Sequence, residues 1–149
     1  MKTFLTLLLA IIILPLLSAC SSGPSKKQLD DEVRRLCAID GGIKVYETVK
    51  LPAYKFEKDG SIYIPSKQIA AEKDGYFYES SMILLRKGNP ELRQYHFKVY
   101  RRTDGKLLGE AVSYSRVGGD IPGPWHHSWF RCPKDADIVD LNMQIFIRK

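Results

Sequence analysis

The chain has 149 residues, of which 44% are hydrophobic, 23 are Lys or Arg and 17 are Asp or Glu, for a net charge of +6. This length suits one domain with its own hydrophobic core. The basic residues are scattered, with no block of five or six like charges, so the composition does not indicate a nucleic-acid-binding tract. A solvated, mildly basic surface fits better, with lipid headgroups or a cell-wall polymer as neighbours.

The first twenty residues have the layout of a secretory signal. Lys2 supplies a positive start, residues 4–17 are apolar except for Thr6 and Pro15, and small residues follow. That order of charged region, apolar region and small-residue cleavage site is typical of export signals. The apolar run is shorter than the roughly 20 residues that a membrane-spanning helix needs.

The signal ends at Leu17-Ser18-Ala19-Cys20, which resembles the lipobox of bacterial lipoproteins. The resemblance implies that residues 1–19 are a signal peptide and that Cys20 is acylated, with palmitate-type chains, as the mature N-terminus. Two chains anchor stably where one does not. The residue after the cysteine is Ser21 rather than aspartate, which for this family implies the outer membrane, facing the periplasm. An ordinary soluble signal peptide, with Cys20 as a plain thiol, is the alternative.

The two remaining cysteines are Cys37 and Cys132. With Cys20 consumed by lipid, they form an even pair in an oxidising compartment, which predicts a disulfide. A bridge that closes about 95 residues stabilises by roughly 4.6 kcal/mol on chain-entropy grounds. Two unpaired buried thiols are the alternative.

Residues 20–25 form a short polar tether, and residues 26–149 are expected to form a single globular domain. Ser25 and Gln28 have the spacing of a capping box, and Leu29, Val33 and Leu36 form one apolar stripe. We therefore expect a helix over residues 26–38, stopped by the glycines at 41 and 42.

Alternating apolar residues and Gly-containing turns predict an antiparallel β-meander of about six to eight strands after the helix. The fold class is therefore α+β, with the N-terminal helix packed on one face of the sheet. The expected strands are residues 43–49, a short hairpin of 54–56 with 62–64, then 76–85, 92–102, 107–117 and a last strand over 139–147.

The most unusual mature segment, residues 118–132, joins a Gly/Pro-rich loop to a run with both tryptophans and two of the three histidines. If this run is a strand, Trp125, His127, Trp129 and Arg131 share one face. Aromatic rings beside an arginine can bind a sugar, a peptide or a partner surface. The alternative is that Trp129 and Phe130 fill the core. The ligand-binding candidates are Trp125, His126, His127 and Tyr114.

Enzymatic and metal-binding functions have weaker support. Neighbouring histidines on a strand point to opposite faces, so His126 and His127 do not readily share an ion, even with His96 as a further ligand. No Gly-x-Ser-x-Gly motif or phosphate-binding glycine loop occurs. A carboxylate pair among Glu47, Glu79 and Glu110 stays open. We expect no catalytic residues, metal or cofactor.

These patterns together predict a non-enzymatic lipoprotein, anchored in the bilayer through Cys20, that contacts another envelope component through a β surface. The expected partner is an envelope protein or a cell-wall polymer, and export argues against nucleic acid. The alternative is a periplasmic ligand- or metal-binding protein, or an enzyme, that uses residues 125–127.

Overall fold

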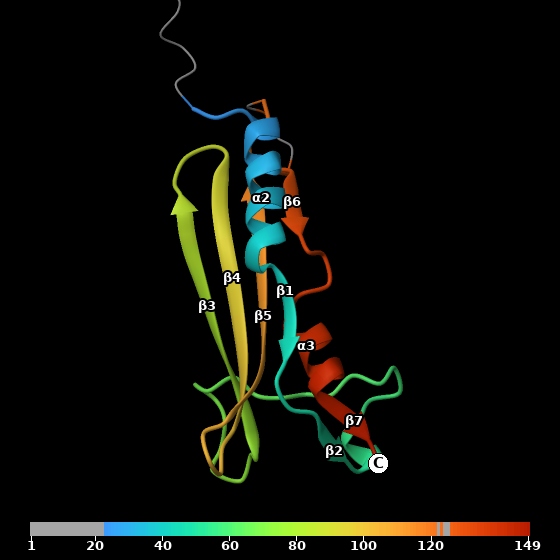
Figure 1. The fold of residues 1–149 in the computed structure, drawn as a ribbon. Coiled ribbons are helices and arrows are strands. Elements are labelled where there is room, and N and C mark those ends of the chain that lie inside the picture. Colours follow the sequence, from blue (N-terminus) through green and yellow to red (C-terminus); the bar gives the residue numbers. More distant parts are fainter. Residues whose placement is uncertain (1–22, 122, 124–125) are drawn as a thin grey trace, which may run out of the picture.

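The structure, a computed structural model, describes residues 23–121, 123 and 126–149. The predicted signal peptide, Cys20 and Trp125 lie outside these residues. The α+β class is confirmed: two α-helices accompany an antiparallel sheet of long strands (Figure 1). The elements are α2 (Lys26–Asp40), β1 (Gly42–Val45), β2 (Val49–Leu51), the 3₁₀ helix η1 (Ala53–Lys55), β3 (Tyr76–Arg86), β4 (Glu91–Arg101), β5 (Leu107–Val117), β6 (Trp129–Cys132), α3 (Ile138–Ile145) and β7 (Phe146–Arg148).

Helix α2 begins with the expected capping box. The Gln28 backbone N–H donates to the Ser25 hydroxyl at 3.2 Å, and the Ser25 N–H donates to the Gln28 side chain at 2.7 Å. The helix ends at Asp40, two residues later than predicted, and buries Leu29 and Val33 of the apolar stripe. The capping-box signal therefore located the start of the helix correctly.

The main sheet is organised around β5, whose neighbours are β4 along one edge and both β1 and β6 along the other. Strand β1 pairs with residues 109–112 of β5, and β6 pairs with residues 114–117. The two short strands thus follow each other along the same edge of β5, and β3 forms the opposite edge of the sheet. The predicted meander holds for β3, β4 and β5 but not for the whole sheet.

The two faces of the sheet are covered differently. Val112 and Tyr114 of β5 pack with Leu29 and Val33 of α2. On the opposite face, Ala111 joins the main core with residues of α3 and the chain around it: Ile62, Ile64, Val99, Leu108, Ala136, Leu141, Ile145 and Phe146. A Cβ on Gly109 would lie 2.9 Å from the Ile145 side chain, so the small residue lets α3 approach the sheet.

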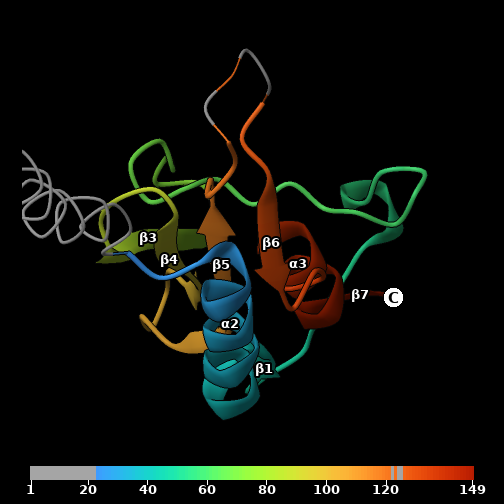
Figure 2. The same ribbon diagram turned by 90° about the horizontal axis from the view of Figure 1, so that it is seen from above.

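Helix α3 covers only the lower part of the sheet face opposite α2, the part farther from residues 23–25. In Figure 1 residues 23–25, the β3–β4 turn and β6 lie at the upper end, and α3 lies lower, beside β1. Seen from above in Figure 2, α2 lies along β5 and apart from α3. The upper half of the sheet face opposite α2 therefore has no helix over it among the described elements. No helix within the described ranges is both long enough and apolar enough to span a bilayer.

The last predicted strand, residues 139–147, is wrong: this segment forms α3 followed by the short β7. The Asp137 carboxylate accepts hydrogen bonds from the backbone of Val139 at 2.8 Å and Asp140 at 3.1 Å, as an N-cap does. The alternating apolar residues also contain a helical set, Leu141 and Ile145, which are fully buried. Val139, which a one-sided strand would bury with Leu141, is exposed.

Two further strand predictions are wrong. Residues 43–49 do not form one strand, because β1 stops at Val45 and β2 begins at Val49 and pairs in parallel with β7. The hairpin of residues 54–56 with 62–64 is absent. Residues 53–55 form η1, and Ile62 and Ile64 enter the main core from a segment without strand pairing.

Candidate functional site

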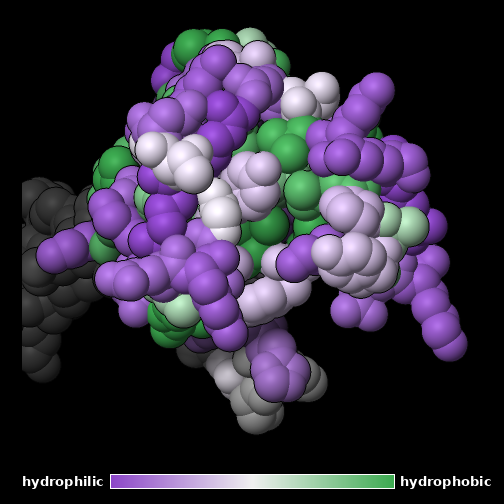
Figure 3. Space-filling model, turned by 90° about the horizontal axis from the view of Figure 1, so that it is seen from below, coloured by the Kyte–Doolittle hydropathy of each residue, from purple (hydrophilic) through white to green (hydrophobic). Residues whose placement is uncertain are grey.

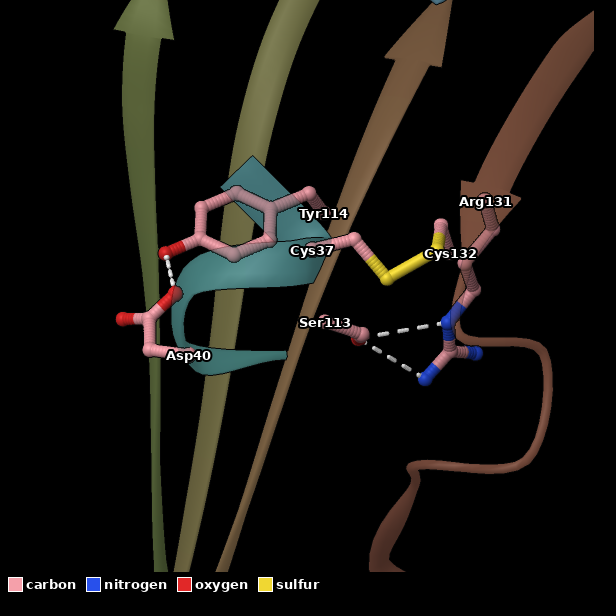
Figure 4. The surroundings of a disulfide bond; sticks show 6 residues. All are labelled: Cys37, Asp40, Ser113, Tyr114, Arg131 and Cys132. Atoms are coloured by element: carbon pink, nitrogen blue, oxygen red, sulfur yellow. Dashed lines mark hydrogen bonds between the residues drawn. A yellow bond between two sulfur atoms is a disulfide. The ribbon is translucent and has the colours of Figure 1, made fainter. Parts of the chain in front are cut away.

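Strand β6 is linked to α2 by Cys37 and Cys132. Their sulfur atoms lie at bonding distance, 2.00 Å, and their Cα atoms are 5.8 Å apart (Figure 4). Cys37 occupies the last turn of α2, and Cys132 ends β6. The structure thus brings together the two cysteines that the sequence pairs. Because β6 has only four residues, this link is a major restraint on where its side chains lie.

Arg131 precedes Cys132 and lies across the neighbouring strand. Its Nε and Nη2 donate to the Ser113 hydroxyl at 3.2 and 3.1 Å, and Nη2 also donates to the Ala136 carbonyl at 3.0 Å (Figure 4). Its half-buried guanidinium makes no ion pair with an acidic side chain in the described part of the chain. The hydrogen bonds found for it within the described residues are all to neutral oxygens.

Trp129 and Arg131 share the uncovered half of the sheet face. With Tyr95, Ser115 and Val117 they line a shallow cavity of about 190 Å³. Trp129 is 67% exposed, although large aromatic side chains usually bury most of their area. The buried Ser115 hydroxyl has no hydrogen-bond partner among the residues that the structure describes, and an unpaired buried hydroxyl costs free energy.

A second hollow of about 310 Å³ adjoins the first at Val117 and is lined by Asn89, Glu91, Arg93, Gly118 and His127. Arg93 donates to Glu91 at 2.9 Å. Hydrogen bonding to Tyr95 and Glu91 raises the pKa of Arg93, which favours its charged form. We call the surface formed by Arg93, Tyr95, Val117, Trp129 and Arg131 the open sheet face. It combines exposed aromatic area with two arginines.

The loop that leads into β6 is tied down by Arg116, whose side chain the sequence analysis did not single out. Arg116 is only 2% exposed. Its Nε donates to Asp30 of α2 at 2.7 Å, and its Nη1 donates to the carbonyls of Gly118 at 2.7 Å and Ser128 at 3.0 Å. A charged residue within the otherwise uncharged stretch 111–117 was the available signal, since buried arginines need such partners.

Asp120 holds the same loop from the other side. Its carboxylate accepts from the Ser128 N–H at 2.6 Å and from Lys26 Nζ at 2.7 Å. The Lys26 ammonium and the Ser128 donors together hold the pKa of Asp120 well below its usual range. The entry to β6 is therefore fixed to the first turn of α2 by charge-assisted hydrogen bonds.

Several predicted site residues lie elsewhere. Tyr114 is 3% exposed, and its hydroxyl donates to Asp40 and accepts from Gln94, both at 2.7 Å (Figure 4). It packs under α2 and does not belong to a ligand surface. The alternative interpretation, that Trp129 and Phe130 both fill the core, is wrong for Trp129. Phe130 does pack against the α2 cluster, and Cζ of Arg34 lies 4.5 Å from the centroid of its ring.

The three histidines are not brought into one site. His126 and His127 are exposed and border different hollows. His96 bonds Glu110 at 2.7 Å on the α2 side of the sheet. In the ranges that the structure describes, no three metal-ligating side chains gather. The hydroxyl of Tyr46 and the ring of His96 together lower the pKa of Glu110.

The candidate carboxylates have separate partners. Glu47 pairs with Arg101 and Lys106, and Glu79 pairs with Lys67. Hydrogen bonds from Lys106 and Arg101 lower the pKa of Glu47. A carboxylate that is held ionised by such partners is a poor general acid at neutral pH.

A further hollow, of about 170 Å³, lies at the opposite end of the domain. Leu51, Ile62, Ile64 and Tyr76 line it, with Lys55 and Lys73 at its border. Seen from below in Figure 3, apolar residues show between hydrophilic ones at this end. Since Ile62 and Ile64 belong to the main core, this hollow is the accessible margin of that core.

In comparisons with family models, curated proteins and solved structures, nothing matches this chain. Function is therefore inferred from the open sheet face and from the motif at Leu17–Cys20.

Proposed function

We propose that this protein is a non-enzymatic lipoprotein of the bacterial cell envelope that binds another envelope component through the open sheet face. The single observation that carries the proposal is that Trp129, 67% exposed, lines one hollow with the half-buried Arg131. Exposed tryptophan with arginine is the composition that dominates the energetics of protein interfaces. The lipobox at Leu17–Cys20 supports the anchoring.

The anchor would keep this surface close to the membrane. Gly23 lies beside Arg86 at the upper end of β3, where a Cβ on Gly23 would be 3.9 Å from the guanidinium. Gly23 is three residue steps from Cys20, and three extended steps span about 10 Å. The upper half of the sheet, which carries Trp129, is therefore the part nearest the anchor.

The non-enzymatic part of the proposal has support from the partners of the reactive groups. The described thiols are at bonding distance from each other, and the carboxylates at 47, 79 and 110 each have a partner of their own. Catalytic sites instead gather nucleophile, base and stabilising donors in one pocket.

The anchor is tested by the mass of the mature N-terminus and by metabolic labelling with an alkyne fatty acid. We expect a chain that begins at Cys20 and carries lipid, and no label in Cys20→Ala. A mature chain with an unmodified N-terminus would refute the anchoring.

The surface is tested by site-specific photo-crosslinking in intact cells, with p-benzoylphenylalanine in place of Trp129. The matched control carries the same probe at Tyr54, an exposed aromatic residue on η1. We expect a discrete adduct only from position 129, and digestion by protease or by muramidase then tells protein from wall polymer. Equal yields from both positions would contradict the proposal.

A further inference from the structure

The outer edge of the main sheet is β3, and part of this edge already pairs with an extended segment. The Tyr78 N–H donates to the Pro65 carbonyl at 3.0 Å, and the Lys67 N–H donates to the Tyr78 carbonyl at 2.8 Å. Ser66 and Tyr78 thereby form a parallel bridge. The lower part of the β3 edge is thus covered by the chain itself.

The upper part of the same edge is open. In an antiparallel pair, alternate residues direct both backbone groups to the same side, and Tyr78 directs its groups outward. The register between β3 and β4 is unbroken from Tyr76 to Leu84, so Ser80, Met82 and Leu84 also direct their backbone groups outward. Within the described residues, the outward N–H and C=O groups of these three residues have no backbone hydrogen-bond partner.

The side chains do not protect this edge. Residues 80–85, Ser-Ser-Met-Ile-Leu-Leu, contain no charge and no proline, and the one irregularity in the pairing of β3 with β4 lies at the upper end of this stretch, between Leu84 and Arg86. Exposed edge strands usually carry Lys, Pro or a bulge that prevents pairing, and Ser80, Met82 and Leu84 lie before the irregularity. Met82 is 54% exposed, Ile83 51% and Leu85 44%. Apolar side chains are therefore exposed on both faces of a strand whose backbone groups are free to pair.

We propose that the upper edge of β3 is a docking site for an extended segment of another envelope protein, which adds to the sheet as a further strand. This inference rests on the proposed envelope function and narrows its partner to a polypeptide. Backbone pairing supplies the affinity of such complexes, and alternate side chains supply the specificity. The parallel bridge at Ser66 shows the same edge accepting an extended chain.

A second copy of this protein fits the edge less well. Arg86, at the upper end of β3, lies beside Gly23 of the same chain. If the β3 strands of two copies paired antiparallel, Arg86 of one copy would lie at the opposite end of the paired stretch from Arg86 of the other. Seven residues, 80–86, extend over about 20 Å, and the three residue steps from Gly23 to Cys20 reach about 10 Å. The anchors of two such copies would therefore reach one bilayer only with the strands strongly tilted toward the membrane plane.

The test places the photo-crosslinking probe at Ser80, Met82 or Leu84 of the lipidated protein in cells, with Met143 on α3 as the control position. We expect adducts to one protein, at sites that step by two residues in the partner as the probe steps by two. Adducts to a second copy of this chain, to lipid or to glycan, or yields no higher than at Met143, would overturn the proposal.

Two variants separate backbone pairing from side-chain contact, with the probe kept at Leu84. Met82→Pro removes an outward N–H and leaves the pairing with β4 intact, so the strand tolerates it. Met82→Thr removes the apolar side chain and keeps the N–H. We expect about a tenfold or greater loss of adduct for Met82→Pro, the upper end of what one hydrogen bond contributes, and a smaller loss for Met82→Thr.

Equal losses for the two variants, with unchanged melting temperatures, would overturn strand addition as the mode of contact. The probe at Trp129 distinguishes the two proposals. Adducts at position 129 without adducts at the β3 edge refute only the edge, and their absence at both refutes the proposed function as well.

Discussion

Replacing both Cys37 and Cys132 with alanine tests how much the link between α2 and β6 stabilises the domain. The bridge closes a loop of 95 residues, which corresponds to roughly 4.6 kcal/mol of unfolding free energy by the loop-entropy relation. For a domain of this size, that loss lowers the melting temperature by about 15 °C. Both side chains also pack against the α2 cluster, so the lost packing adds to this figure.

The same change should loosen β6 before the rest of the sheet. Without the bridge, β6 keeps four paired residues on β5 and the hydrogen bonds of Arg131. We expect the fluorescence of Trp129, measured in a Trp125→Phe background, to change at a lower urea concentration than the far-ultraviolet circular dichroism signal does. The bridged protein should show coincident transitions.

The assay is urea unfolding of the purified, non-lipidated protein, with Cys20→Ser in every variant so that only Cys37 and Cys132 can carry a thiol, with and without a reducing agent. Reduction should destabilise the natural protein to the level of the alanine variant and should leave that variant unchanged. Cys132→Ser alone should lower the melting temperature sharply and leave one reactive thiol at Cys37. A loss below about 1 kcal/mol, far under the loop-entropy figure, or two reactive thiols in the untreated protein, would refute the reasoning.

Three other changes test the packing and the loop. Arg116→Met leaves the Asp30 carboxylate without its buried cation and should cost about 3–5 kcal/mol of unfolding free energy in urea titrations; a cost below 1 kcal/mol would contradict the assigned network. Leu141→Ala should cost about 2–5 kcal/mol because Leu141 is fully buried, while the exposed Val139→Ala should change little; equal costs would favour a strand over α3. The lowered pKa of Asp120 means that its ionised form stabilises the fold above about pH 4 and that this stabilisation is lost as the pH falls below that value. Natural protein should therefore lose stability between about pH 4 and pH 2 more steeply than Asp120→Asn, and parallel pH profiles would argue against the Lys26–Asp120–Ser128 contacts.

The sequence predicts most reliably where one local signal determines the structure. The capping box at Ser25 and Gln28 acts within one turn, so it located the start of α2. The turn at Asp104-Gly105 joins two long alternating strands, and β4 and β5 pair as predicted. The odd number of cysteines, given the lipobox, pairs Cys37 with Cys132, which are adjacent in the structure.

Prediction failed where two local patterns compete. Residues 138–147 alternate as a strand does, yet they also place Leu141 and Ile145 on one helical face. The Asp137 cap and the space beside Gly109 favour the helix, and the second of these exists only in the folded sheet. Residues 62–64 were predicted to pair in a hairpin, but Ile62 and Ile64 enter the main core without strand pairing.

By itself, the sequence of this protein determined the α+β class, the start of α2 and the pairing of Cys37 with Cys132, because each depends on neighbouring residues or on a count. Only the tertiary structure decided which face of the sheet stays uncovered and which edge stays open. Those features depend on where α3 packs and on which strands flank β5, and both are set by contacts between residues far apart in the chain. The exposure of Trp129 and the open edge at residues 80–85 both follow from that packing.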